Sequence, residues 1–210
     1  MRRAVCAAIL GLVSLWAADA RATPVTFAFS GEITFVASLD PSNPFPIEPA
    51  FGTPFSGTFT FDSNAVDDIP GDPTTGSYIS AGAPFGLTLS LGGLDLTYGA
   101  VNIGVTDGYS SYGPGGDQYL FGFSGGDTVV SARFTDFGGT LFSNDSLPLT
   151  AFPLNGLFTE LLFSDIINDS QVELGGSITS LTTVPEPATL LVVGAGLCGL
   201  IRRRQSRAPR

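Results

Sequence analysis

The sequence has no histidine, and its two cysteines, Cys6 and Cys198, lie near the two ends of the chain. Residues 23–183 therefore offer neither an imidazole nor a thiol group. Their absence excludes the usual zinc, haem and iron–sulfur ligand sets, and also the Ser-His-Asp and Cys-His catalytic arrangements. It also means that this region contains no disulfide bond.

Positive charge is scarce in the same region. Residues 23–183 hold 17 of the 19 acidic residues, and Arg133 is their single cation, which gives a formal net charge of −16. Such a surface repels phosphate backbones, so nucleic acid is not an expected partner. It favours divalent cations instead, and calcium is the one candidate cofactor.

Long apolar runs are confined to the two ends. Arg2 and Arg3 precede a mostly apolar run over residues 4–16, which is followed by small residues that fit a cleavage site. This pattern predicts a secretory signal peptide over residues 1–22, exported by the Sec translocon and removed by signal peptidase.

At the other end, fourteen mostly apolar residues, 188–201, precede an arginine cluster that includes Arg202, Arg203 and Arg204. A helix of this length reaches about 21 Å, less than the roughly 30 Å hydrocarbon core, so arginine snorkelling or local thinning of the bilayer is needed. We predict a single transmembrane helix with this basic stop in the cytoplasm and the preceding residues outside.

The four residues Val184, Pro185, Glu186 and Pro187 stand directly before this apolar run. The prolines favour an extended peptide around the glutamate. Together the three parts resemble the PEP-CTERM sorting signal of Gram-negative bacteria, also catalogued as the ice-binding protein C-terminal motif. The resemblance implies recognition by an exosortase, a membrane-embedded cysteine transpeptidase that cuts near the Pro-Glu-Pro and passes the protein toward the surface or matrix. The alternative is an ordinary C-terminal anchor.

Between the targeting segments, residues 23–183 have the length of one domain with a real core. Phe27, Phe29, Gly31, Ile33 and Phe35 occupy alternate positions over 26–37, and phenylalanines alternate with polar residues over 55–62. This period of two is typical of β-strands. Further candidate strands cover 100–106, 118–124, 128–134, 139–142 and 172–181, and 156–167 is either a short helix or a strand. Many short strands without a βαβ rhythm predict an all-β, antiparallel β-sandwich or jelly-roll-like domain.

The clearest local element is a hairpin around Gly92-Gly93. Leucines alternate with polar residues on both sides of this two-residue turn, over 87–91 and 94–98. Pairing Leu91 with Leu94 puts the apolar side chains of both strands on one face.

Two loops carry candidate binding residues. The acidic loop offers oxygen ligands that calcium prefers, but it departs from the EF-hand pattern, so the alternatives are another kind of calcium site and a solvated turn. Its candidate ligands are Asp62, Asn64, Asp67, Asp68 and Asp72.

A glycine-rich stretch places Tyr109, Tyr112 and Tyr119 near Asp107 and Asp117. Aromatic rings beside carboxylates are suited to holding sugars. The alternative is a hairpin loop whose tyrosines fold back on the sheet.

These observations predict a non-enzymatic protein, anchored in the inner membrane with its domain in the periplasm and then passed to the cell surface or extracellular matrix. Association with exopolysaccharide is expected. The first alternative is a carbohydrate- or calcium-binding adhesin module. The second is a glycosidase with a carboxylate pair, although 17 acidic residues single out no pair.

Overall fold

A computed structural model describes residues 23–38, 48–109, 115–126, 128–167 and 170–185, and this part of the chain contains ten β-strands. The strands are β1 (Pro24–Ser38), β2 (Pro54–Asp62), β3 (Thr75–Ala81), β4 (Gly86–Leu91), β5 (Leu94–Tyr98), β6 (Ala100–Tyr109), β7 (Gly116–Gly125), β8 (Thr128–Asp136), β9 (Phe158–Ile167) and β10 (Ser170–Val184). No helix occurs among these residues.

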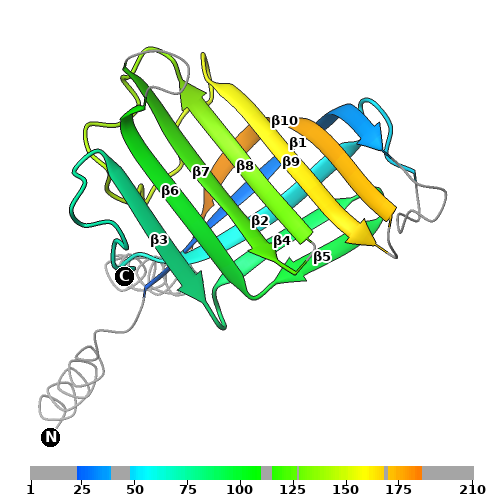
Figure 1. Ribbon diagram of the computed structural model, residues 1–210, viewed down its shortest axis with the longest axis horizontal. Coiled ribbons are helices and arrows are strands. Elements are labelled where there is room, and N and C mark those ends of the chain that lie inside the picture. Colours follow the sequence, from blue (N-terminus) through cyan, green and yellow to red (C-terminus); the bar gives the residue numbers. More distant parts are fainter. Residues whose placement is uncertain (1–22, 39–47, 110–114, 127, 168–169, 186–210) are drawn as a thin grey trace, which may run out of the picture.

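All ten strands belong to one antiparallel sheet in the order β3-β6-β7-β8-β9-β10-β1-β2-β4-β5. The sheet curves so strongly that its two halves face each other. Strands β3 and β6 to β9 lie in front of β10, β1, β2, β4 and β5 in Figure 1, and the two sets cross at a steep angle. The all-β antiparallel class is confirmed. The finer assignment to a sandwich or jelly roll stays a prediction, because the ladders join all strands into one sheet.

Aromatic rings fill the space between the two halves. Phe59 of β2 stacks on Phe121 of β7 at 3.8 Å between ring centroids, and Phe29 of β1 lies 5.1 Å from the same ring. All three side chains are buried. Because such contacts join strands far apart in the sheet, burial of these rings explains why the sheet folds over on itself.

The hairpin register is confirmed. Leu91 pairs with Leu94, Leu89 with Leu96 and Leu87 with Tyr98. Gly92 and Gly93 have φ values of +58° and +77°, so both central positions of the turn need the left-handed conformation that glycine adopts without strain.

Three other segments differ from the sequence-based expectation or decide between its alternatives. Residues 156–167 form a strand, since β9 covers Phe158–Ile167. The prediction of a strand over 139–142 is wrong, because these residues are irregular. Strand β3, between the acidic loop and the hairpin, was not predicted.

The irregular segment between β8 and β9 is held by a buried carboxylate. Asp117 of β7 is 0% exposed, and its two oxygens accept hydrogen bonds from the backbone amides of Phe142, at 2.8 Å, and Gly108, at 3.1 Å. Hydrogen bonds from amides offset the cost of burying this charge. Asp117 therefore ties the segment to the sheet at Phe142, although residues 139–142 form no strand.

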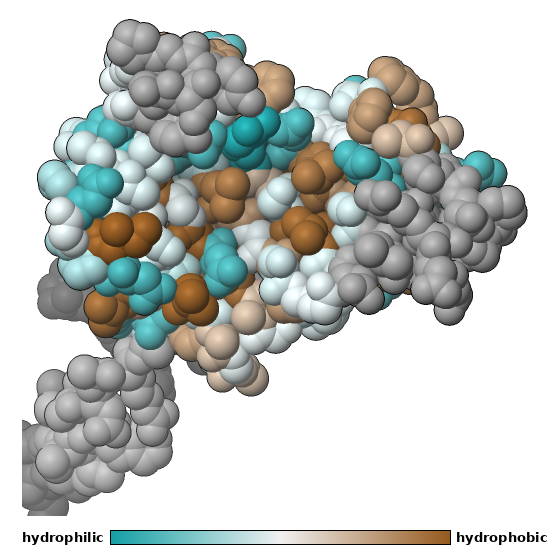
Figure 2. All heavy atoms as spheres, viewed as in Figure 1, coloured by the Kyte–Doolittle hydropathy of each residue, from teal (hydrophilic) through white to brown (hydrophobic). Residues whose placement is uncertain are grey.

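The outward face of β3 and β6 to β9 is mixed in character. Figure 2 shows apolar side chains separated by polar ones over this half of the sheet, and exposed Ile79 and Val129 belong to it. Arg133 forms an ion pair here with Glu160, and its guanidinium carbon lies 5.9 Å from the centre of the Phe158 ring. No single apolar patch dominates this face, so it does not resemble a large hydrophobic interface.

The predicted signal peptide and transmembrane helix lie outside the described residues. Within those residues, the search for a helix long and apolar enough to cross a membrane finds none.

Candidate functional site

The first candidate site is the C-terminal end of β10. This strand lies between β1 and β9 in the sheet and continues to Val184, which pairs with Thr26. The side-chain oxygen of Thr183 accepts a hydrogen bond from the amide of Ala151 at 2.8 Å. Pro185 follows outside the strand and is exposed. The predicted sorting residues thus begin where the folded sheet ends, without a spacer.

The remaining predicted sorting residues, Glu186, Pro187, Arg202, Arg203 and Arg204, lie outside the described residues.

Carboxylates of the acidic loop between β2 and β3 accept hydrogen bonds from the loop's own backbone. Oδ1 of Asp67 accepts from the amides of Ile69 and Ser77, each at 2.9 Å. Oδ1 of Asp72 accepts from the hydroxyl of Thr74 at 2.7 Å and from its amide at 2.9 Å, and these bonds lower the pKa of Asp72. These side chains therefore shape the turn that leads into β3.

The same loop was the predicted calcium site. In the part of the chain that the structure describes, no group of three or more acidic side chains comes together as a metal-ligand cluster. The Oδ1 atoms of Asp67 and Asp72 instead accept hydrogen bonds within the loop and from the start of β3. A calcium site with the candidate ligands Asp62, Asn64, Asp67, Asp68 and Asp72 and a solvated turn remain the two alternatives for this loop.

Of the three tyrosines that the sequence offered for sugar binding, only Tyr119 has a side chain that the structure describes. Tyr119 is 0% exposed and lies in the core, with its ring 5.3 Å from that of Phe152, so it is not available to a sugar. Burial raises the pKa of Tyr119 well above its ordinary value. Tyr109 ends β6, where its backbone pairs with Gly116, and Tyr112 lies outside the described residues.

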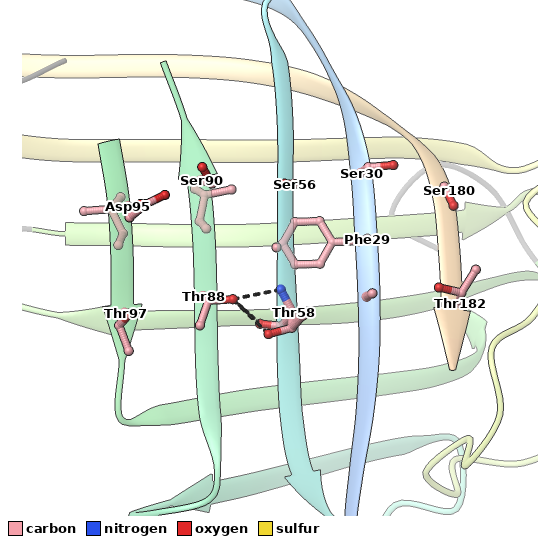
Figure 3. Close-up of a pocket in the computed structure, with 14 residues that line it drawn as sticks. Phe29, Ser30, Ser56, Thr58, Thr88, Ser90, Asp95, Thr97, Ser180 and Thr182 are labelled. Carbon is pink, nitrogen blue, oxygen red and sulfur yellow. Dashed lines mark hydrogen bonds between the residues drawn. The ribbon is translucent and has the colours of Figure 1, made fainter. Parts of the chain in front are cut away.

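A feature that the sequence did not reveal lies on the outward face of the other half of the sheet. Here serine and threonine side chains line up across five adjacent strands, β10, β1, β2, β4 and β5 (Figure 3). One row is Thr182, Ala28, Thr58, Thr88 and Thr97, and the next is Ser180, Ser30, Ser56, Ser90 and Asp95. We call these two rows the hydroxyl face.

The hydroxyl face is hollowed. A groove of about 640 Å³ is lined by both rows. A second hollow of about 470 Å³ shares Ser30, Ser56 and Ser90 with it and extends to the turn at Gly92 and Gly93. Among the described residues, Asp95 is the only charged side chain that lines either hollow.

Part of the hydroxyl face is fixed by its own hydrogen bonds. The hydroxyl oxygens of Thr58 and Thr88 are 2.8 Å apart, and the amide of Thr58 donates to the Thr88 oxygen at 3.0 Å, as the dashed lines in Figure 3 show. Ser56 and Ser90 are exposed beside this pair. The face therefore combines positioned threonines with serine hydroxyls that solvent or a ligand can reach.

The comparison with protein families bears on the C-terminal end. The family model of the PEP-CTERM protein-sorting motif matches residues 183–205. The chain carries a PEP-CTERM sorting motif. None of the curated proteins and none of the solved structures matches the chain.

The PEP-CTERM motif is the signal that an exosortase recognises, so the chain is an exosortase-sorted surface protein that is exported toward the cell envelope. Its matched region includes Thr183 and Val184, the last residues of β10. The motif is therefore joined directly to the middle of the sheet.

Proposed function

We propose that this protein is a non-enzymatic component of the cell surface or extracellular matrix that associates with exopolysaccharide. The observation that carries the proposal is the direct junction between a PEP-CTERM motif and β10, a strand of an acidic β-domain that is paired on both sides. Such a design presents one folded unit outside the cell and holds it at its C-terminal end.

The route begins with Sec export directed by residues 1–22. Residues 188–201 then hold the chain in the inner membrane, with the domain in the periplasm and Arg202 to Arg204 in the cytoplasm. The exosortase cuts near Pro185-Glu186-Pro187 and releases the domain to the surface or matrix.

A non-enzymatic role is supported by the hydrogen bonds of four of the carboxylates. Those of Asp67, Asp72, Asp117 and Asp136 accept hydrogen bonds from backbone amides, which leaves these groups engaged in loop structure. A glycosidase needs two free carboxyl groups on either side of a bound sugar. The second candidate, a carbohydrate-binding adhesin module, is favoured by the hydroxyl face.

The sorting step is tested by the intact mass of the protein recovered from the surface and from the inner membrane. Wild-type surface material should lack residues 188–210. Replacing Glu186 by Ala, or Arg202 to Arg204 together by Gln, should leave full-length protein in the inner membrane. Glu48→Ala, which changes an exposed glutamate outside the strands, is the matched control and should be processed normally.

Matrix association is tested by comparing exopolysaccharide-rich and exopolysaccharide-free fractions of the same cells. Recovery of the processed protein equally from both fractions would contradict the association. A wild-type surface form that still carries residues 188–210 would mean that the C-terminal segment is a plain anchor.

A further inference from the structure

The hydroxyl face has the chemistry of a site for another hydroxyl-rich molecule. Each serine or threonine hydroxyl both donates and accepts hydrogen bonds, as sugar hydroxyls do. Exposed Ser56 and Ser90 lie side by side on β2 and β4, within reach of Thr58 and Thr88 in the next row. A ligand with hydroxyls at regular intervals meets complementary groups along both rows.

The dimensions fit a chain more than a small molecule. Neighbouring strands are about 4.8 Å apart, so the five strands of the hydroxyl face span roughly 19 Å. The groove of about 640 Å³ continues into the hollow of about 470 Å³ at Ser30, Ser56 and Ser90. Small-molecule sites usually enclose most of their ligand, whereas this site is an open track across strands.

Charge selects among polysaccharides. Of the described residues that line the hollows, none is cationic and Asp95 alone is charged. Residues 23–183 as a whole carry a formal net charge of −16. The single arginine of that region, Arg133, is on β8, in the other half of the sheet. Polymers with carboxylate or sulfate groups are therefore repelled, and a neutral chain is not.

We propose that the hydroxyl face binds a neutral, hydroxyl-rich polysaccharide laid across β10, β1, β2, β4 and β5, an assignment that rests on the proposed association with exopolysaccharide. Phe29 lines the groove but is only 2% exposed, so the face offers no exposed ring on which a sugar stacks. Binding per sugar unit is accordingly weak. Retention comes from many copies of the protein meeting one long polymer.

Affinity electrophoresis of the purified full chain in detergent tests the site. Native gels contain dextran, galactomannan or a mixed-linkage β-glucan as neutral probes and alginate as the anionic probe. At least one neutral probe should retard the protein, and alginate should not. The double variant S56R/S90R fills the groove with two long side chains and should abolish retardation. S56A/S90A keeps the space but removes two hydroxyls, and its dissociation constant should rise by about 10-fold.

The matched control is N102R/S124R. Both residues are exposed, on β6 and β7 in the other half of the sheet, and the change in net charge is the same. It should migrate like the wild type, and circular dichroism should show that all variants keep the β-fold.

Retardation of S56R/S90R equal to that of the wild type would overturn the assignment, as would retardation by alginate alone or by none of the probes. Shaping of ice crystals without retardation by any neutral probe would also overturn it, in favour of a face that matches a crystal lattice. Because the purified chain is measured without an exosortase, these failures leave the sorting reaction untouched. If cells do not process the wild-type chain but the purified chain still binds a neutral probe, only the proposed function is contradicted.

Discussion

Two tyrosines show how much depends on a single hydroxyl group. The Tyr78 hydroxyl donates a hydrogen bond to the backbone oxygen of Asp145 at 2.9 Å. The hydroxyl of Tyr119 is buried and has no hydrogen-bond partner among the residues that the structure describes. The alternation of β7 indicates that Tyr119 faces inward, but only the three-dimensional neighbours decide whether its hydroxyl is satisfied. The sequence therefore could not show that the hydroxyl of this inward-facing tyrosine lacks a hydrogen-bond partner.

We predict that Tyr119→Phe leaves stability unchanged or raises the free energy of unfolding by about 1 kcal/mol, because it removes an unsatisfied buried hydroxyl. Tyr78→Phe should lower it by about 1 kcal/mol, because it removes a made hydrogen bond. Urea denaturation of the two variants gives both values. Equal decreases in the free energy of unfolding of the two variants would contradict the difference in hydrogen bonding between the two tyrosines.

The same pair predicts the behaviour of the fold in alkali. Burial raises the pKa of Tyr119 well above its ordinary value, and burial with the nearby carboxylates of Asp67 and Asp145 also raises that of Tyr78. A tyrosine whose pKa is higher in the folded state than in the unfolded state stabilises the fold fully at pH values below its unfolded pKa, near 10. This stabilisation is lost as the pH rises above that value. The free energy of unfolding of the wild type should therefore fall as the pH rises above about 10. The fall should be smaller in Tyr119→Phe, as followed by urea midpoints at each pH.

At the scale of elements, the hairpin of β4 and β5 was predictable because everything that defines it is local. Gly92 and Gly93 fix the turn, and the alternating leucines fix which face is buried. Strand β3 was missed because it pairs with β6, and the whole β4–β5 hairpin lies between these two strands in the sequence. No turn joins β3 to β6 directly. The false strand at 139–142 has a similar cause. Asp117, which accepts a hydrogen bond from the amide of Phe142, lies 25 residues away from it in the sequence.

The hairpin register has a direct test. Leu89→Asp should lower the free energy of unfolding by several kcal/mol, or unfold the chain, because a charge enters the buried face. Thr97→Asp, on the exposed face of the paired strand, should change it by less than about 0.5 kcal/mol. Thr88 is a poorer control, since its hydroxyl bonds to Thr58. Comparable damage at positions 89 and 97, measured by urea denaturation, would show that the register is wrong.

At the scale of the whole molecule, the sequence predicts strands and their alternation, but not which strands become neighbours. The order β10-β1-β2-β4-β5 joins segments that are more than 100 residues apart. Each strand shows its serines and threonines as ordinary solvent-facing residues. Only the pairing of these strands in register converts them into the hydroxyl face.

The negative charge of residues 23–183 predicts a response to ions. Screening of mutual repulsion should raise the melting temperature as sodium chloride increases from low ionic strength. At matched ionic strength, we expect calcium and magnesium to give equal melting temperatures, because the carboxylates of Asp67 and Asp72 already accept hydrogen bonds from their own loop. Differential scanning calorimetry makes the comparison. A rise specific to calcium would establish the metal site in the acidic loop, since a ligand at about 100 times its Kd stabilises by about 2.7 kcal/mol.

The position of β10 has a mechanical consequence. Any pull on the C-terminus enters the fold through this strand, which is paired with β1 on one side and β9 on the other. An edge strand can be peeled away one hydrogen bond at a time, but a load along β10 has to shear two ladders simultaneously. Resistance to forced unfolding is set by the unfolding rate rather than by equilibrium stability. We therefore expect the domain to withstand tension for as long as its C-terminal membrane segment holds it, before the exosortase cuts.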